Sequence, residues 1–177
     1  MKPWAERLKI KIEPLGKHHD RSSFNCGQPD LDSWFRLRAS QDEKRNIARV
    51  FVAVADDLGV VGFYSLSSLS LSLDHLPEQV AHKLPRYDAI PAALIGRLAR
   101  DERVRGQGVG ELLLADAISR VLGAGRSIAV FAIVVDAKDE RAVGFYQTFG
   151  FQPFPLRPNR LFLLTATAAS GLARSLS

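Results

Sequence analysis

The sequence predicts an α/β protein with a mixed central β-sheet flanked by helices, and three features support this prediction. An apolar, strand-like segment, 92–99, leads into a glycine-rich turn and then into 111–122, an apolar stretch without a helix breaker. A second apolar segment, 128–135, has the composition of a strand covered on both faces. The 177 residues are 46% hydrophobic, enough for the core of one domain. We place that domain at 1–165 and expect a frayed, alanine- and serine-rich tail at 166–177.

The composition also excludes several classes of protein. No apolar run is long enough to span a membrane and the N-terminus is charged, so we expect a soluble, cytoplasmic protein. The single cysteine, Cys26, excludes an internal disulfide. The four histidines lack metal-ligand spacing, so we expect loop residues and no metal. The net charge of +5 suits an anionic partner such as coenzyme A or nucleic acid, although an ordinary basic surface explains it equally well.

The N-terminal part is expected to form one strand and one helix. Apolar and charged residues alternate over 8–12, as in a half-buried strand. A helix is expected to follow with Asp30 as its N-cap, because Leu31, Trp34 and Phe35 share one face. Its later turns, toward Arg45, carry basic residues.

The remaining segments suit a sheet protein. The segments 49–55 and 60–70 read as two strands joined by a hairpin turn. Prolines bracket 84–91, which we expect to be extended and rigid. After the strand at 128–135 come a loop, a short helix that stops at Gly150, and a last strand at 160–164.

The turn at 103–110, with the sequence Arg-Val-Arg-Gly-Gln-Gly-Val-Gly, has the features of an anion site. The first amides of a helix lack internal partners and carry positive potential. Gly106 and Gly108 allow a ligand to approach the backbone. A P-loop would need Lys-Ser/Thr where Glu111 stands, and a dinucleotide fold would need Gly-x-Gly-x-x-Gly. We interpret the turn as a diphosphate cradle, with a simple packing turn as the alternative.

Two motifs make the chain resemble a known family. The Arg-x-x-Gly-x-Gly pattern within 103–110 resembles the coenzyme A loop of the GNAT acetyltransferases. The segment 142–151 resembles that family's closing signature, Ala-x-x-Phe-Tyr-x-x-x-Gly-Phe. The resemblance implies a GNAT fold, with a V-shaped splay between the central strands, and acetyl-CoA as co-substrate.

The N-terminal half narrows the resemblance to the GNAT toxins of bacterial toxin–antitoxin pairs. Similar segments lie at 24–34, 49–52, 61–66, 85–91 and 95–99. The resemblance implies acetylation of the α-amine of aminoacyl-tRNA, a block of translation, a ribbon-helix-helix antitoxin as partner, and a homodimer. Arg100 departs from the group, which usually has a small apolar residue there.

The resemblance also implies which residues contact acetyl-CoA. They come from the central strand, the glycine turn and the closing helix: Leu98, Ala99, Arg100, Arg103, Arg105, Gly106, Gln107, Gly108, Val109, Gly110, Ala142 and Phe145. The amides of 105–110 would hold the diphosphate, with Arg103 and Arg105 as charge partners. Amides at 98–100 would polarise the thioester carbonyl.

Tyr146 is the candidate general acid, because a phenol with a pKa of about 10 can protonate a departing thiolate. A packing aromatic is the alternative, and we read Tyr64 and Tyr87 in that way. No carboxylate stands out as general base, since we expect Asp101 and Glu102 to face solvent. The α-amine of an aminoacyl ester is partly neutral at pH 7, so a water suffices.

Basic residues from separate elements are candidates for contacts with tRNA, although each also suits a solvated surface. They are Arg36, Arg38, Lys44, Arg45, Lys83, Arg86 and Arg97. Cys26 has no neighbouring motif that would make it a nucleophile, and we expect a small buried hydrophobe. Two other functions stay open: a GNAT acetyltransferase of a small-molecule or protein amine, and a non-catalytic module that binds coenzyme A or a partner.

Overall fold

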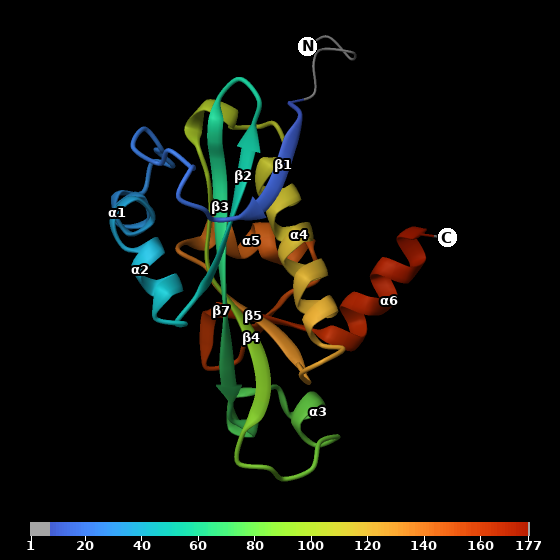
Figure 1. Cartoon of the computed structure of the whole chain (residues 1–177). Helices are drawn as coiled ribbons and strands as arrows, with labels where there is room; N and C mark the ends of the chain where they lie inside the picture. The colour runs from blue at the N-terminus through green and yellow to red at the C-terminus, as the bar shows by residue number, and fades with distance from the viewer. Residues whose placement is uncertain (1–7, 177) are drawn as a thin grey trace. The chain divides into compact units, whose positions relative to one another are not determined.

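The computed structural model describes residues 8–176, and it contains a mixed sheet with helices (Figure 1). The strands are β1 (Ile10–Pro14), β2 (Arg49–Ala55), β3 (Gly59–Leu71), β4 (Ile90–Arg100), β5 (Ala132–Asp136), β6 (Gln152–Phe154) and β7 (Arg157–Leu164). The α-helices are α1 (Pro29–Leu37), α2 (Ala39–Lys44), α3 (Glu78–Ala81), α4 (Val109–Ala124), α5 (Glu140–Thr148) and α6 (Thr165–Leu176). Short 3₁₀ turns lie at Leu73–His75 and Glu102–Val104.

The seven strands follow the order β1-β2-β3-β4-β5-β7-β6. β4 and β5 are parallel, whereas β1–β2, β5–β7 and β6–β7 are antiparallel pairs, so the predicted mixed sheet is confirmed. The β4–β5 ladder pairs Ala92–Ile95 with Ala132–Val135. The V-shaped splay beyond that ladder stays a prediction. Within residues 8–176, no helix has the length and apolarity that crossing a membrane requires.

The chain forms two compact units. The first contains the described residues up to Ser65 together with Arg97–Asp116, and the second contains Leu66–Gly96 and the chain from Ala117 onward. Each unit therefore combines two separate segments of sequence. The boundaries between the segments fall within β3, β4 and α4, so each of these elements contributes residues to both units.

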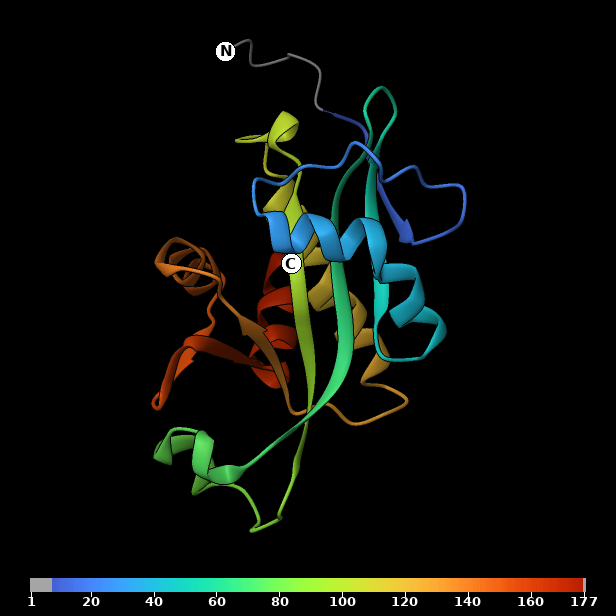
Figure 2. The same cartoon turned by 90° about the vertical axis from the view of Figure 1, so that its left-hand side faces the viewer.

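An aromatic cluster forms the core of the first unit. The rings of Phe35, from α1, and Phe63, from β3, stack with centroids 4.1 Å apart, and Phe24 meets Phe35 edge-on at 4.9 Å. Val50 and Val52 of β2 complete the cluster, and all five side chains are buried. Because each such side chain contributes about 1.5–3 kcal/mol on burial, this contact holds α1 against the strands (Figure 2).

The predicted N-terminal helix is in fact two helices. Gln28 rather than Asp30 is the N-cap of α1, since Pro29 takes the first helical position, where a missing N–H costs nothing. The helix breaks at Arg38, with φ −121°, and α2 begins at once. The break places Ala39 in the core and lets the Trp34 indole donate to Asp42 Oδ2 at 2.9 Å.

The second unit has its own core, which includes Leu71, Ala132, Val134 and the Phe154–Phe162 ring pair, 5.1 Å between centroids. The strand expected at 128–135 begins only at Ala132, and the Ile128 side chain is exposed. β6 was not predicted, because three residues are too few for a periodic pattern.

The tail expected to fray from residue 166 is instead helical, as α6. Thr165 anchors the start of α6, since its Oγ1 donates to the carbonyls of Val130 and Phe131 at 2.7 and 3.0 Å. Alanine, frequent in this segment, has the highest helix propensity of all residues. The hairpin turn and the helix stop were predicted correctly: both Gly59 and Gly150 have positive φ, 74° and 92°.

Candidate functional site

The glycine turn joins β4 to α4 within the first unit. Val104 and Val109 are buried and anchor its two ends, while Gly106 and Gly108 have φ of 77° and 79°, which glycine adopts without strain. A Cβ built on Gly106 would meet no atom within 4 Å. Internal packing therefore does not require glycine at this position, and the space above its backbone is open to a ligand.

The residues around these glycines are mostly exposed. Arg105, Gln107 and both glycines lie on the surface, whereas Gly110 is half-buried. The N–H of Leu112 donates to the carbonyl of Gly108 at 3.1 Å, so the amides that precede Leu112 form the N-terminus of α4. This arrangement is suited to binding the diphosphate of an acyl-CoA through main-chain donors.

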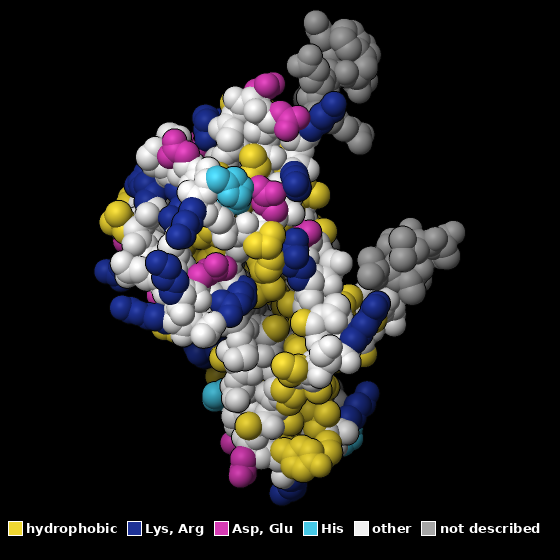
Figure 3. All heavy atoms as spheres, viewed as in Figure 1, with side chains coloured by type: hydrophobic (Ala, Val, Ile, Leu, Met, Phe, Trp, Pro, Cys, Tyr) yellow, Lys and Arg dark blue, Asp and Glu magenta, His cyan; other side chains and the backbone are white. Residues whose placement is uncertain are grey.

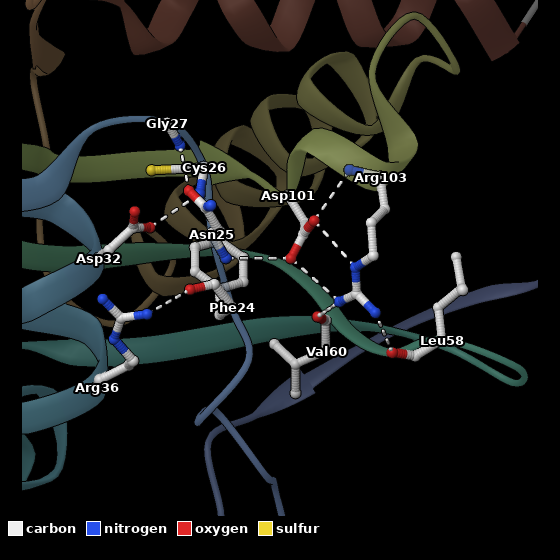
Figure 4. Close-up of polar contacts among 10 residues, drawn as sticks. All are labelled: Phe24, Asn25, Cys26, Gly27, Asp32, Arg36, Leu58, Val60, Asp101 and Arg103. Atoms are coloured by element: carbon white, nitrogen blue, oxygen red, sulfur yellow. Dashed lines mark hydrogen bonds and ion pairs between the residues drawn. The ribbon is translucent and has the colours of Figure 1, made fainter.

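Asp101 was expected to face solvent, and this expectation is wrong: only 2% of the residue is exposed. Its Oδ1 accepts from the backbone N–H of Arg103 at 2.9 Å and from Nε at 3.0 Å (Figure 4). Its Oδ2 accepts from Arg103 Nη2 at 3.0 Å and from the Asn25 N–H at 3.2 Å. The sequence signal for this role is an acidic residue between the end of a strand and an anion-binding turn.

Arg103 therefore has a structural role as well as being a candidate ligand contact. Besides Asp101, its guanidinium donates to the carbonyls of Leu58 and Val60, at 3.2 and 3.3 Å. These bonds join the turn to the β2–β3 hairpin. The exposed Arg105 is the better candidate for charge pairing with a diphosphate.

Burial acts to raise the pKa of the Asp101 carboxyl, but hydrogen bonds from Arg103 and Asn25 act the other way and leave that pKa below the ordinary 3.8. A lowered carboxyl pKa stabilises the folded protein above the unfolded-state pKa, and this contribution is lost as pH falls through the folded-state value. We therefore expect Asp101→Asn to cost about 1–3 kcal/mol in the free energy of unfolding near pH 7. The difference from wild type should shrink below about pH 4.

Urea denaturation of both proteins, repeated from neutral to acid pH, measures this convergence. Asp88→Asn, at an exposed position, is the matched control, and its free energy of unfolding should equal that of wild type at every pH. A constant difference at every pH would contradict the stated role of the Asp101 charge.

Tyr146 lies in α5, in the second unit. Asp139 caps this helix by accepting from the Ala142 N–H at 2.8 Å. Tyr146 is 6% exposed and packs against Phe145 and Phe151, with centroids 5.3 and 5.7 Å away. Within the described part of the chain, no hydrogen bond reaches its hydroxyl. Ring packing rather than hydrogen bonding thus positions the Tyr146 side chain. Ala142 and Phe145, both candidate acetyl-CoA contacts, are half-buried on the same helix.

The pKa of Tyr146 differs from the sequence-based expectation. Burial, with a further contribution from the charge of Asp136, raises it from the ordinary 10 to about 12. Asp136 lies at the end of β5 and is held by Arg160, whose Nε and Nη2 donate to its two carboxylate oxygens at 2.7 and 2.8 Å. The Tyr146 phenol therefore stays protonated throughout the physiological range of pH.

Asp136→Asn is expected to lower the pKa of Tyr146, because the substitution removes a negative charge that disfavours tyrosinate. Ultraviolet titration of tyrosinate measures this shift, with a Tyr146→Phe background to subtract the other two tyrosines. Lys138→Met, at an exposed position nearby in the chain, controls for general effects of a charge change. An unaltered Tyr146 titration in Asp136→Asn would contradict the electrostatic explanation.

The basic candidates fall into two groups. Arg36, Arg38, Lys44 and Arg45 are exposed on or beside α1 and α2, where Lys and Arg side chains gather on the surface (Figure 3). The other exposed candidates, Lys83 and Arg86, follow α3 in the second unit.

Arg97 does not lie with these exposed residues. Its guanidinium carbon lies 3.9 Å from the centroid of the Trp34 ring, a cation–π contact. Burial lowers the pKa of Arg97, with the charge of Asp42 acting in the opposite direction. Arg97 is half-buried, and its stacking contact explains its presence without an RNA ligand.

Tyr64, Tyr87 and Cys26 were expected to be packing residues. Tyr64 is fully buried and donates to Asp116 Oδ2 at 2.5 Å, which confirms its packing role. Tyr87 is 66% exposed, so the packing prediction was wrong there. Cys26 is only half-buried, although it packs against the aromatic cluster of the first unit as a small hydrophobe would.

Glu13, His18 and His19 place potential metal-ligand atoms within 4.8 Å of one another, a grouping that sequence spacing did not reveal. His19 Nδ1 accepts from the Gly16 N–H at 2.8 Å, so its Nε2 carries the proton and donates to Glu13 at 2.7 Å. Both ring nitrogens of this histidine are thereby engaged, and the hydrogen bonds explain the grouping without an ion.

Comparison with known proteins supports the acetyl-CoA interpretation. Residues 46–153 match the model of the acetyltransferase (GNAT) domain. The chain is 39% identical to a protein of Sinorhizobium fredii named probable toxin TacT, over 90% of this chain and 93% of the relative. It is 40% identical to a tRNA-acetylating toxin of Mycobacterium tuberculosis, over 84% of this chain and 88% of the relative.

Solved structures agree with this assignment. A tyrosine-to-phenylalanine mutant of KacT superposes with a TM-score of 0.85 at 29% identity, covering 91% of this chain and 98% of KacT. AtaT in complex with acetyl-methionyl-tRNAfMet gives the same TM-score at 28% identity, covering 92% and 99%. AtaT with acetyl-CoA and the C-terminus of its antitoxin AtaR gives 0.75 at 26% identity, covering 89% and 94%. The matched domain and the glycine turn together show that this chain belongs to the GNAT family of acetyltransferases.

Proposed function

We propose that this protein is a toxin that transfers the acetyl group of acetyl-CoA to the α-amine of aminoacyl-tRNA and so blocks translation. The likeness to AtaT bound to acetyl-methionyl-tRNAfMet, over 92% of this chain, carries the choice of substrate. The likeness to a relative named tRNA-acetylating toxin supports the same choice. Acetylation of the α-amine would prevent that amine from attacking the ester bond of peptidyl-tRNA, which is the step that forms the peptide bond.

In this proposal, the diphosphate of acetyl-CoA lies on the amides of 105–110, and Arg105 supplies positive charge. The positive φ and open surface of Gly106 support this assignment. Amides at 98–100 polarise the thioester carbonyl, a role that belongs to the backbone rather than to side chains. Ala142 and Phe145 of α5 contact the coenzyme, as the family signature implies.

Tyr146 is proposed to convey a proton to the leaving sulfur. The amine nitrogen attacks the thioester carbon, the C–S bond breaks, and the proton lost by the amine must reach the thiolate. A phenol with a pKa of about 12 does not release its proton to a thiolate unless it regains one. We therefore assign Tyr146 as a relay, which donates to sulfur while it accepts the proton of the attacking nitrogen.

The exposed basic residues of α1 and α2 are proposed to contact the tRNA backbone. Replacing Arg38, Lys44 and Arg45 together by alanine should raise KM for aminoacyl-tRNA and leave KM for acetyl-CoA unchanged. The salt dependence should weaken by about 0.7–0.9 in the slope of log K against log salt for each phosphate contact removed. Binding of tRNA at several salt concentrations measures this slope. A matched triple variant at Lys9, Lys11 and Lys17 is the control, and equal effects of both triples would contradict a local contact surface.

A solved neighbour supports an antitoxin protein as partner. AtaT binds the C-terminus of the antitoxin AtaR, and we propose an antitoxin of the ribbon-helix-helix type for this protein as well. We also propose a homodimer, and action in the bacterial cytoplasm, where aminoacyl-tRNA is found.

A transfer assay tests the proposal. Radiolabelled acetyl-CoA and the protein are mixed with a total aminoacyl-tRNA pool, with deacylated tRNA, with free amino acids, or with protein and small-molecule amines. Label that enters only the aminoacylated pool would support the proposed substrate. Label in small amines or protein termini alone would instead identify an ordinary GNAT acetyltransferase. Binding of acetyl-CoA with no transfer to any acceptor would favour a non-catalytic module.

A further inference from the structure

We propose that Asp101 is a positioning residue that fastens the acetyl-CoA turn to α1, so that binding of one substrate alters the affinity for the other. The inference rests on the proposed function, because it takes the turn as the acetyl-CoA site and α1 as part of the tRNA surface. The observation that carries it is a continuous run of hydrogen bonds between these two elements within the first unit (Figure 4).

The run begins on α1. Asp32, 4% exposed, accepts the Cys26 N–H on Oδ1 at 2.8 Å. One turn later, Arg36 donates through Nη1 to the Phe24 carbonyl at 2.9 Å. Two side chains of α1 thus hold the segment 24–27, which precedes the helix.

The same segment is attached to the turn. The N–H of Asn25 donates to Asp101 Oδ2 at 3.2 Å, and the Asn25 carbonyl accepts the Glu102 N–H at 2.9 Å. A Cβ built on Gly27 would lie 2.5 Å from Glu102 Oε1, so the exposed Glu102 side chain also lies against this segment. Displacement of either element must therefore be accommodated by the other.

Asp101 is the junction of these contacts. Four donor groups from Arg103 and Asn25 reach its carboxylate, and Arg103 extends the contacts to Leu58 and Val60. A buried charge that is well paired seldom stabilises a protein more than an apolar group of equal volume would. Stability alone consequently does not explain a carboxylate at this position, whereas fixing the geometry of a ligand turn does.

Most of the buried polar side chains of the first unit belong to this run of hydrogen bonds. In the described part of the chain, the buried polar or charged residues are Asp32, Ser65 and Asp101. The two carboxylates lie at the two ends of the run, one on α1 and one at the entrance to the turn. Such hydrogen-bonded links between rigid elements can transmit coupling between two ligand sites.

The experiment measures binding rather than turnover. Calorimetry gives the dissociation constant of coenzyme A, and filter binding gives that of acetylated aminoacyl-tRNA, which cannot react further. Each is measured with and without the other ligand, so that the coupling factor is obtained in both directions and must agree. The proteins are wild type, Asp101→Asn, Asp32→Ala, and the exposed control Asp88→Asn.

We expect wild type and Asp88→Asn to show a coupling factor of about 5 or more. Asp101→Asn should bind coenzyme A roughly tenfold more weakly, because an amide cannot accept from all four donors, and its coupling factor should fall to about 1. Asp32→Ala, which does not contact the turn, should also abolish coupling. If circular dichroism shows that Asp101→Asn is unfolded, the coupling factor of Asp32→Ala alone tests the inference.

A folded Asp101→Asn or Asp32→Ala with the wild-type coupling factor would overturn this inference, and so would the absence of coupling in wild type. In both cases, acetyl transfer to aminoacyl-tRNA would leave the proposed function intact. Failure of acetyl transfer by the wild-type protein, measured in the separate transfer assay, would overturn the proposed function itself, whether or not coenzyme A binds in the calorimeter.

Discussion

Replacing Tyr146 by phenylalanine is expected to lower kcat by about 10²–10⁴-fold, the range in which proton transfer by a positioned side chain contributes. The ring contacts with Phe145 and Phe151 remain, so folding and the dissociation constant of acetyl-CoA should change little. Only the hydroxyl, and with it the proton route to sulfur, is removed. Single-turnover transfer at saturating concentrations of both substrates measures this effect directly.

Tyr87→Phe provides the matched control, because Tyr87 is exposed and also loses only a hydroxyl. It should transfer acetyl at the wild-type rate. An undiminished kcat in Tyr146→Phe would contradict the proposed proton relay by Tyr146 and would favour a water molecule as the proton donor.

Gly106→Leu is expected to weaken acetyl-CoA binding by roughly 10²-fold, which corresponds to losing two charged hydrogen bonds of about 1.5 kcal/mol each. The new side chain would meet no protein atom at its Cβ, so it would project into the space assigned to the diphosphate. The positive φ of 77° also adds strain for any residue with a Cβ, of about 1–2 kcal/mol. Isothermal calorimetry with acetyl-CoA measures the loss of affinity.

Gly59→Leu separates these two effects. Gly59 has a similar φ, 74°, and a Cβ there would also meet nothing within 4 Å, but it lies at the start of β3, directly after the hairpin turn. Both variants should lose comparable stability in thermal unfolding, and Gly106→Leu should lose the larger share of acetyl-CoA affinity, because Gly59 is linked to the turn only through the bonds of Arg103 to Leu58 and Val60. Equal affinities in the two variants would remove the turn from the proposed binding site.

The features that could be predicted from sequence are those encoded in short segments. The glycine turn, the stop at Gly150 and the hairpin at Gly59 depend on backbone conformations that one residue type favours, and the structure confirms all three. The hydrophobic patterns of β2 and β3 likewise identify strands without any knowledge of their neighbours.

The prediction of Tyr146 as a functional residue also came from a local motif, and its catalytic role stays a prediction. Its pKa was not predictable from that motif, because the rise to about 12 depends on burial and on Asp136 at the end of β5. A sequence motif can identify a titratable group, whereas its proton affinity depends on which side chains the fold places around it.

Sequence alone thus determined the fold class, the glycine turn and the family to which this chain belongs. Only the tertiary structure decided that Asp101 is buried, that Arg103 is engaged with it, and that Arg97 stacks on Trp34. The Asn25–Asp101 hydrogen bond joins residues 76 positions apart. Local propensity carries no information about such a pair, because its energy exists only when folding brings both groups together and removes them from water.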